Sequence, residues 1–264
     1  MKPSPTKKQG ISVKTDDIFA LGSHKLLCGD CTNTDLVQQF IGKTKVDLIL
    51  TDPPYGVSYV EGKQGFTESK NAHRTIVNDH TQGEEEYRTF TRAWLEAVKH
   101  RLATKNGYYI FNADKMVFAL REGILDAGYR FGQLLIWAKT SAVVGRMDYL
   151  PQHELIAYGW FGKHTFHKAK DKSVLIHPRP QSNTLHPTMK PVGLLRRLIL
   201  NSSNIGQVIY DPFGGSGSTL LACEQTKRKC LMVEIDPAYC QVIIDRYEKL
   251  TGEKAQKISP KHHA

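Results

Sequence analysis

The chain lacks any apolar stretch long enough to cross a membrane. A transmembrane helix needs about 20 predominantly apolar residues, and no run in this chain of 264 residues approaches that length. Its first ten residues are polar and lack the apolar centre of a secretory signal. The sequence therefore predicts a cytoplasmic protein without a membrane partner, and its 40% hydrophobic residues are enough to build a core.

Cysteine is scarce, and the pattern of a zinc site is missing. Cys28 and Cys31 form a Cys-x-x-Cys pair among five cysteines. No second pair and no paired histidines follow at the spacing of zinc ligands, and a structural zinc usually takes four ligands. We therefore expect reduced, buried thiols and no metal.

Acidic residues are nearly absent from one segment. The whole chain carries 36 basic and 26 acidic residues, a net charge of +10, but Asp171 is the only acid between Lys163 and Arg197. A basic segment suits contact with the phosphates of a polyanion, although a single basic run is more often a solvated loop. The candidate phosphate-binding residues are Lys163, Lys168, Lys170, Lys172 and Arg179.

Short apolar runs alternate with helical patterns along the chain. This alternation predicts βα units and therefore an α/β fold with a mostly parallel sheet. The seven expected strands are Lys25–Cys28, Val46–Thr51, Tyr108–Asn112, Gln133–Ala138, Glu154–Tyr158, Gln207–Tyr210 and Cys230–Val233.

The remaining segments define helices, ends and loops. Helices are expected over Glu84–Leu102 and Pro191–Leu200, and after the capping pair Asp236-Pro237. Residues 1–20 are expected to be a flexible basic arm, 21–252 a single domain and 253–264 a tail. The polar stretches 57–83 and 159–187 read as long loops near the carboxyl ends of the strands, where open α/β sheets bind ligands.

A glycine-rich turn follows the strand that ends at Tyr210. It reads Asp211-Pro212-Phe213-Gly214-Gly215-Ser216-Gly217-Ser218-Thr219, and glycines let the backbone approach a nucleotide-like ligand closely. The turn lacks the Lys of a P-loop, the last Gly of a nucleophile elbow and the spacing of a dinucleotide fingerprint. Glu234 ends the next strand, about twenty residues on, and is placed to bind ribose hydroxyls. A surface charge is the alternative reading of that single acid.

A second segment, Asp52-Pro53-Pro54-Tyr55, follows the apolar run that ends at Thr51. The two prolines fix the backbone and remove two amide donors. What remains is a rigid turn with two acceptors, the Asp52 carboxylate and the Pro53 carbonyl. These can hold the two hydrogens of an exocyclic amine, while Tyr55 stacks on the ring that bears it. A proline turn with a capping Asp and a core Tyr is the structural alternative.

Together, in this order, the two segments resemble the β class of DNA amino-methyltransferases, which methylate N6 of adenine or N4 of cytosine. The resemblance spans about Gly29 to Tyr247 and implies a Rossmann-like, circularly permuted, seven-stranded methyltransferase fold with S-adenosylmethionine as cofactor. It assigns catalysis to Asp52, Pro53, Pro54 and Tyr55. It assigns cofactor binding to Asp30, His186, Pro187, Thr188, Lys190, Asp211, Pro212, Phe213, Gly214, Gly215, Ser216, Gly217 and Glu234, with His186–Pro191 lining the methionine end.

The resemblance favours adenine, because Asp as the first residue of the catalytic segment is commoner for N6-adenine and Ser for N4-cytosine. Cytosine C5 methylation is excluded, since the chain has no Pro-Cys dipeptide to supply its nucleophile. Chemistry on a base requires that it leave the helix. The alternatives are N4-cytosine methylation, a catalytically silent nucleic-acid-binding relative, and methylation of RNA or of protein glutamine.

The expected partner is double-stranded DNA, read by the segments 57–83 and 159–187. Both are short for an independent recognition domain. The class includes many dimers, so a homodimer is a further expectation that no feature of the sequence decides.

Overall fold

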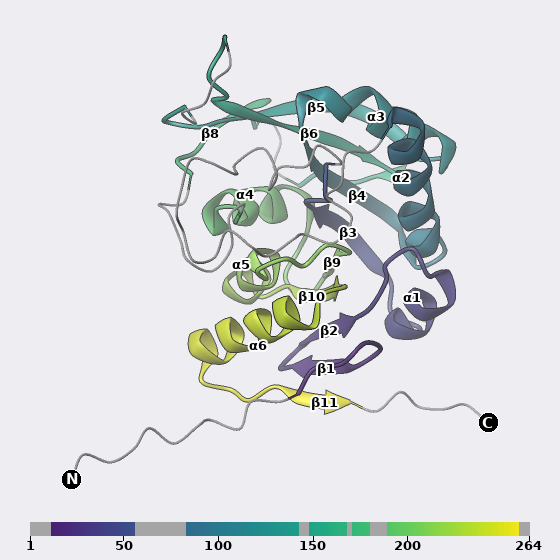
Figure 1. Cartoon of the computed structure of the whole chain (residues 1–264), viewed down its shortest axis with the longest axis vertical. Helices are drawn as coiled ribbons and strands as arrows, with labels where there is room; N and C mark the ends of the chain where they lie inside the picture. The colour runs from purple at the N-terminus through teal and green to yellow at the C-terminus, as the bar shows by residue number, and fades with distance from the viewer. Residues whose placement is uncertain (1–11, 56–82, 143–147, 168–170, 180–188, 259–264) are drawn as a thin grey trace.

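The computed structural model describes residues 12–55, 83–142, 148–167, 171–179 and 189–258. Within these residues, eleven strands form one sheet in the order β11-β1-β2-β10-β9-β3-β4-β6-β5-β8, with β7 beside β4 (Figure 1). The strands are β1 (Ile18–Leu21), β2 (His24–Cys28), β3 (Val46–Thr51), β4 (Leu102–Asn112), β5 (Arg130–Ala138), β6 (His153–Trp160), β7 (Lys163–His164), β8 (Val174–Ile176), β9 (Val208–Asp211), β10 (Lys229–Glu234) and β11 (Gln256–Ile258).

The centre of the sheet is parallel. Strands β2, β10, β9, β3 and β4 run in one direction, and β6 runs antiparallel to both β4 and β5. Parallel strands are buried on both faces and read as nearly continuous apolar runs, as Val46–Thr51 does. The seven strands expected from the sequence are all present and adjacent in the sheet, so the predicted α/β fold is confirmed.

The chain order of the strands is also the one expected. β9, which leads into the glycine-rich turn, comes late in the sequence but lies in the middle of the sheet, between β10 and β3. β2, near the N-terminus, lies on the far side of β10. The circular permutation is therefore confirmed.

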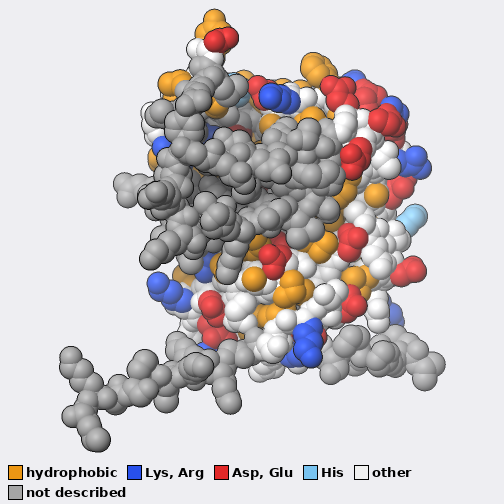
Figure 2. Space-filling view, in the orientation of Figure 1, with side chains coloured by type: hydrophobic (Ala, Val, Ile, Leu, Met, Phe, Trp, Pro, Cys, Tyr) orange, Lys and Arg blue, Asp and Glu red, His pale blue; other side chains and the backbone are white. Residues whose placement is uncertain are grey.

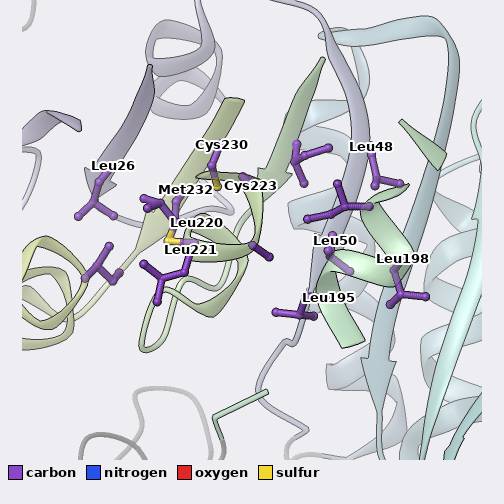
Figure 3. Packing of buried hydrophobic residues seen from close by; sticks show 14 of the residues in the cluster. Leu26, Leu48, Leu50, Leu195, Leu198, Leu220, Leu221, Cys223, Cys230 and Met232 are labelled. Atoms are coloured by element: carbon purple, nitrogen blue, oxygen red, sulfur yellow. The ribbon is translucent and has the colours of Figure 1, made fainter. Parts of the chain in front are cut away.

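Helices cover both faces of the sheet (Figure 1). Buried residues of α1, α2 and α3 belong to one hydrophobic cluster. Buried residues of α4, α5 and α6 belong to another, on the opposite face of the sheet, part of which is shown in Figure 3. The helices are α1 (Thr34–Ile41), α2 (Glu84–Lys99), the 3-10 turn η2 (Asp114–Met116), α3 (Val117–Asp126), α4 (Val192–Ser202), α5 (Ser218–Thr226) and α6 (Pro237–Thr251). No helix in the described ranges is long and apolar enough to span a bilayer.

Local chemistry sets the helix ends. The Asp236 side chain accepts from the backbone N–H of Ala238 at the start of α6, as the capping pair predicted. Gly252, with φ of 78°, caps the end of the helix. α2 ends at Lys99, three residues before the predicted end, because Leu102 begins β4 and pairs with Val46.

Four short strands were not expected, and two of them correct the predicted ends of the domain. β1 contains residues 18–20 of the predicted arm, and β11 contains residues 256–258 of the predicted tail. They pair antiparallel with each other, Ile18 opposite Ile258, at the edge of the sheet. Each is too short to show a periodic apolar pattern, and only their pairing makes them strands.

Candidate active site

The catalytic segment and the glycine-rich turn meet at the carboxyl edge of the sheet. They follow β3 and β9, which are parallel neighbours. The Thr51 hydroxyl, just before Asp52, donates a hydrogen bond of 2.7 Å to Oδ1 of Asp211, which also accepts from the backbone N–H of Phe213 at 3.1 Å. Asp211, 3% exposed, therefore points into the protein and ties the two segments together.

The Asp52 carboxylate is held by two side chains. Its Oδ2 lies 2.5 Å from Nζ of Lys190, and its Oδ1 accepts from the Tyr55 hydroxyl at 2.5 Å. Its side chain is 25% exposed, whereas the adjacent Pro53 is buried. The rigid turn predicted from the two prolines thus places a partly accessible carboxylate at the edge of the sheet, with an aromatic ring beside it.

Two further charged residues, Glu154 and Lys139, extend the contacts of Lys190. Glu154 Oε2 lies 3.1 Å from Nζ of Lys190, and Glu154 Oε1 lies 2.9 Å from Nζ of Lys139. Lys190 is only 7% exposed. We call the four residues Lys139, Glu154, Lys190 and Asp52 the ion-pair network, in which positive and negative side chains alternate.

The network shifts the titration of its members. Burial raises the pKa of Asp52, opposed by the charge of Lys190. Burial would also raise the pKa of Glu154, but Lys190 and Lys139 together bring it below its ordinary value. Burial lowers the pKa of Lys190, but the carboxylates of Asp52 and Glu154 outweigh this effect and raise it overall. Lys190 therefore stabilises the charged forms of both carboxylates, and they stabilise its own.

The glycine-rich turn needs its glycines at two positions in particular. A Cβ on Gly214 would lie 2.8 Å from Cγ of Met232, and Gly217 has φ of 81°. A side chain would be forced into the core at the first position and strained at the second. Phe213, predicted to bind the cofactor, packs its ring against Phe90 at 5.7 Å and Trp94 at 5.5 Å, both in α2.

Glu234 is held by backbone amides rather than by side chains. Its Oε2 accepts from the N–H of Gly215 at 2.6 Å and its Oε1 from the N–H of Asp236 at 2.9 Å. It is 8% exposed, and burial raises its pKa from 4.5 to about 7. Asp30 follows the neighbouring strand β2 and is exposed; its Oδ1 accepts from the backbone and the hydroxyl of Thr32. Both predicted acids therefore lie at the same edge as the turn.

Of the predicted basic residues that the structure describes, Lys163 and Arg179 lie towards different edges of the sheet. β8 runs parallel to β5, so the exposed Arg179 beyond its end lies towards the same edge as Lys139. Lys163 pairs with Lys105, whereas Thr51 pairs with Ile110. Lys105 precedes Ile110 by five residues along β4. At about 3.3 Å a residue, Lys163 therefore lies roughly 17 Å from the level of Thr51, towards the amino edge.

The predicted position of the segment 159–187 is therefore wrong for its first part. β6 is antiparallel, so the residues that follow it, from Phe161 to Lys163, lie at the amino edge. Lys172 precedes β8; it is exposed and lies next to Asp171, which pairs with Arg197. Figure 2 shows acidic and basic side chains mixed over α2 and α3, so that part of the surface presents no basic patch.

Several predicted residues lie outside the described ranges. They are Lys168, Lys170, His186, Pro187, Thr188 and nearly all of the segment 57–83. Within the described ranges no group of three or more His, Cys, Asp or Glu is placed to hold a metal. All five cysteines are free and buried, as expected.

Three residues of the site were not predicted: Thr51, Lys139 and Glu154. Lys139 directly follows a predicted strand and Glu154 begins one. A charged residue at the end of an apolar run was the available signal, but it does not reveal which edge of the sheet that end reaches.

Comparison with known proteins assigns the family. The model of the DNA methylase family N6_N4_Mtase matches residues 46–245, a span that contains Asp52, Glu154, Lys190, the glycine-rich turn and Glu234. The chain belongs to this family. The resemblance seen in the sequence is thus confirmed, and so is the cofactor expected for this methylase, S-adenosylmethionine.

Relatives match nearly the whole domain of this methylase. It is 26% identical to the type II methyltransferase M.HpaI of Haemophilus parainfluenzae over 83% of its own length and 73% of that protein. It is 24% identical to the type II methyltransferase M2.MboI of Moraxella bovis over 81% of its length and 86% of that protein.

Solved structures share the fold. The complex of M1.HpyAVI with S-adenosylmethionine matches 84% of this methylase and 98% of that chain, with a TM-score of 0.61 and 21% identity. The cytosine-N4-specific PvuII DNA methyltransferase matches 94% and 97%, with a TM-score of 0.65 and 16% identity.

Proposed function

We propose that this DNA methylase transfers a methyl group to N6 of adenine in double-stranded DNA, on a base that has left the helix. The observation that carries the proposal is the Asp52 carboxylate, partly exposed at the edge of the sheet and next to the Tyr55 ring. A base inside the duplex cannot reach such a site, so the base must be extruded.

Asp52 and Pro53 supply the chemistry of the amine. The Asp52 carboxylate and the Pro53 carbonyl each accept one hydrogen of the exocyclic amine, which favours a pyramidal nitrogen with a localised lone pair. A fixed acceptor costs no reorganisation during the reaction. Because Lys190 stabilises the charged form of Asp52, the carboxylate remains an acceptor, and the proton lost from the methylated nitrogen passes on to water.

The residues around the glycine-rich turn fit the cofactor. S-adenosylmethionine supplies an electrophilic methyl group on a sulfonium. Gly214 and Gly217 let the backbone approach a ligand where any side chain would collide or strain. Glu234 is positioned by two backbone amides and keeps lone pairs for the ribose hydroxyls. Asp30 follows the neighbouring strand β2 and lies towards the adenine of the cofactor.

N4-cytosine methylation is the second candidate. The specificity of the PvuII enzyme shows that this fold accommodates cytosine. An exocyclic amine is common to both bases, so the acceptors Asp52 and Pro53 suit either. Asp rather than Ser at position 52 is the feature that favours adenine here.

The deciding experiment is methyl transfer from labelled S-adenosylmethionine to unmethylated duplex DNA, with the product nucleosides identified by mass spectrometry. N6-methyladenine is the expected product. Formation of N4-methylcytosine would agree with the proposed mechanism but contradict the assignment of adenine as the target base. Parallel reactions with RNA and with total protein test the remaining alternatives. If cofactor binding is intact and no substrate is methylated, the proposed function is wrong.

The basic residues allow a prediction about the DNA-facing edge. Arg179→Ala should weaken DNA binding several-fold and flatten the dependence of log K on log salt by about one, as loss of one phosphate contact does. Lys163→Ala, roughly 17 Å back along β4, is the matched control and should change neither quantity. Fluorescence anisotropy over a salt series measures both. Equal effects of the two substitutions would contradict the assignment of DNA to the carboxyl edge.

A further inference from the structure

Lys190 is the buried centre of the ion-pair network. Its Nζ lies 2.5 Å from Asp52 Oδ2, 3.1 Å from Glu154 Oε2 and 3.2 Å from the Tyr55 hydroxyl. Its three hydrogens can thus meet three oxygens, which is the full donor capacity of an ammonium group. Lys190 directly precedes Pro191, the cap of α4, so its backbone belongs to the entry of a packed helix.

Aromatic rings limit where the ammonium can go. Nζ lies 5.2 Å from the centre of the Phe111 ring and 5.6 Å from that of Tyr55. Both distances are within cation–π range. The side chain therefore has a defined site between two carboxylates and two rings, rather than freedom to follow either carboxylate.

Glu154 is fixed in its turn. Its second oxygen lies 2.9 Å from Nζ of Lys139, and the Lys139 side chain is 9% exposed. Lys139 lies over the Trp137 ring at 5.2 Å. Each oxygen of Glu154 thus has its own lysine, and this places Glu154 so that Lys190 is drawn towards β6 as well as towards Asp52.

Stability alone does not account for this arrangement. Buried ion pairs recover little more than the desolvation of their charges, and apolar replacements of similar volume are often as stable. What such a network does provide is a fixed geometry. It lies directly against the carboxylate to which the amine chemistry has been assigned.

We propose that Lys190 is a positioning residue for Asp52, and that Glu154, anchored by Lys139, sets the position of Lys190. Lys190 retains Oδ2 of Asp52 throughout, so that Oδ1, now bonded to the Tyr55 hydroxyl, is the oxygen that the amine takes over. Release of that bond leaves Tyr55 free to stack on the base. The inference rests on the proposed function of Asp52.

The network predicts the direction in which the pKa of Asp52 changes when a member is replaced, because Lys190 and Glu154 act on that pKa in opposite directions. Lys190 lowers the pKa of Asp52 and Glu154 raises it. The other groups that face Asp52 are the Tyr55 hydroxyl, with Tyr87 of α2 and Asp211 of β9 within electrostatic reach. Substitutions at 190 or 154 leave Tyr87 and Asp211 in place, and each removes one contact of the Tyr55 hydroxyl while its bond to Asp52 is kept.

The test compares Lys190→Met with Glu154→Gln in the full chain. We expect Lys190→Met to move the acid limb of the pH profile of single-turnover methyl transfer to higher pH, and Glu154→Gln to move it to lower pH. At pH 7.5 Lys190→Met should slow transfer about 10²-fold, the order expected when a reacting group is misplaced by about 1 Å. Glu96→Gln and Lys257→Met are matched controls, since they break the surface pairs with Arg92 and Asp17.

A second readout does not depend on activity. With ¹³C-labelled carboxyl groups, NMR titration should show the Asp52 midpoint rising in Lys190→Met and falling in Glu154→Gln. Shifts of the same sign, or none in well-folded variants, would overturn the inference even if the wild type methylates DNA. If the wild type methylates nothing while the opposite shifts appear, the proposed function fails and the positioning of Asp52 stands. Should Lys190→Met not fold, Glu154→Gln alone still decides the sign.

Discussion

Asp52 and Glu234 are both carboxylates at the carboxyl ends of strands, and they are held in different ways. Asp52 bonds to two side chains, Lys190 and Tyr55. Glu234 bonds to two backbone amides, those of Gly215 and Asp236. Burial raises the pKa of both, but only Asp52 has a charged partner to oppose it.

The difference matches the role proposed for each carboxylate. Amides of a tight turn cannot move without unfolding it, which suits an acid that recognises one unchanging pair of hydroxyls. Side-chain partners can exchange, which suits an acid that must admit an amine and release it again. Neutral amides do not compensate a full charge, so Glu234 titrates near neutrality with a pKa of about 7.

The largest test of this contrast is Asp52→Ala. It should lower the single-turnover rate about 10²- to 10³-fold, the scale of losing one preorganised group at a reacting centre. Cofactor affinity should change less than about threefold, because Glu234 and the turn lie on other strands. Transfer of labelled methyl groups measures the rate, and calorimetry measures cofactor binding.

Asp52→Asn sharpens the same comparison. It keeps one acceptor oxygen but removes the charge that Lys190 faces, so its rate should also fall by orders of magnitude. A well-folded Asp52→Ala protein that had lost its affinity for S-adenosylmethionine would contradict the separation of the two sites.

Glu234→Gln tests the second carboxylate of the comparison and should have a smaller effect than the substitutions of Asp52. We expect S-adenosylmethionine to bind about 10- to 100-fold more weakly, because one acceptor and its charge are lost. In the wild type, affinity should fall roughly tenfold from pH 8 to pH 6, since only the ionised fraction binds fully and the pKa is about 7. The variant should show a flat profile over that range.

The thermal stability of Glu234→Gln separates binding from folding. The folded pKa of about 7 is above the ordinary 4.5, so Glu234 contributes stability below about pH 4.5 that is lost as the pH rises through 7. At pH 8 the substitution removes a buried charge, which offsets the lost acceptor, and the melting temperature should change little. A wild-type affinity independent of pH would show that Glu234 is not the ribose ligand.

The sequence predicted the parts of the site that are continuous in the chain. Asp52 and the glycine-rich turn each follow an apolar run, and parallel strands bring such ends to one edge. The same rule failed for β6, which is antiparallel. Its first residues, including Glu154, reach the catalytic edge, while Lys163 beyond its far end does not. Strand direction depends on tertiary pairing, which an apolar run does not encode.

The contacts of Lys190 also could not be predicted from the sequence. The resemblance placed it with the cofactor-binding residues, because its segment directly precedes the glycine-rich strand in the chain. Within the protein, its described polar contacts are with Asp52, Glu154 and Tyr55. Which carboxylate a long lysine reaches depends on the start of α4, and only the folded geometry determines that.

The smallest expected effect concerns the hydrogen bond between Thr51, just before the catalytic segment, and Asp211 of the glycine-rich turn. Thr51→Val keeps the shape of the side chain but removes the donor to Asp211 Oδ1. Burial already raises the pKa of Asp211 to about 7, and the substitution should raise it further. The loss should be about 1–2 kcal/mol above pH 7, where the ionised carboxylate needs its donors, and smaller at pH 6. Urea unfolding at pH 6 and pH 8 measures the difference, and methyl transfer should slow only a few-fold. A larger loss of rate than of cofactor affinity would show that the bond aligns Asp52 against the turn, whereas equal stability at both pH values would show that Asp211 does not ionise in the folded protein.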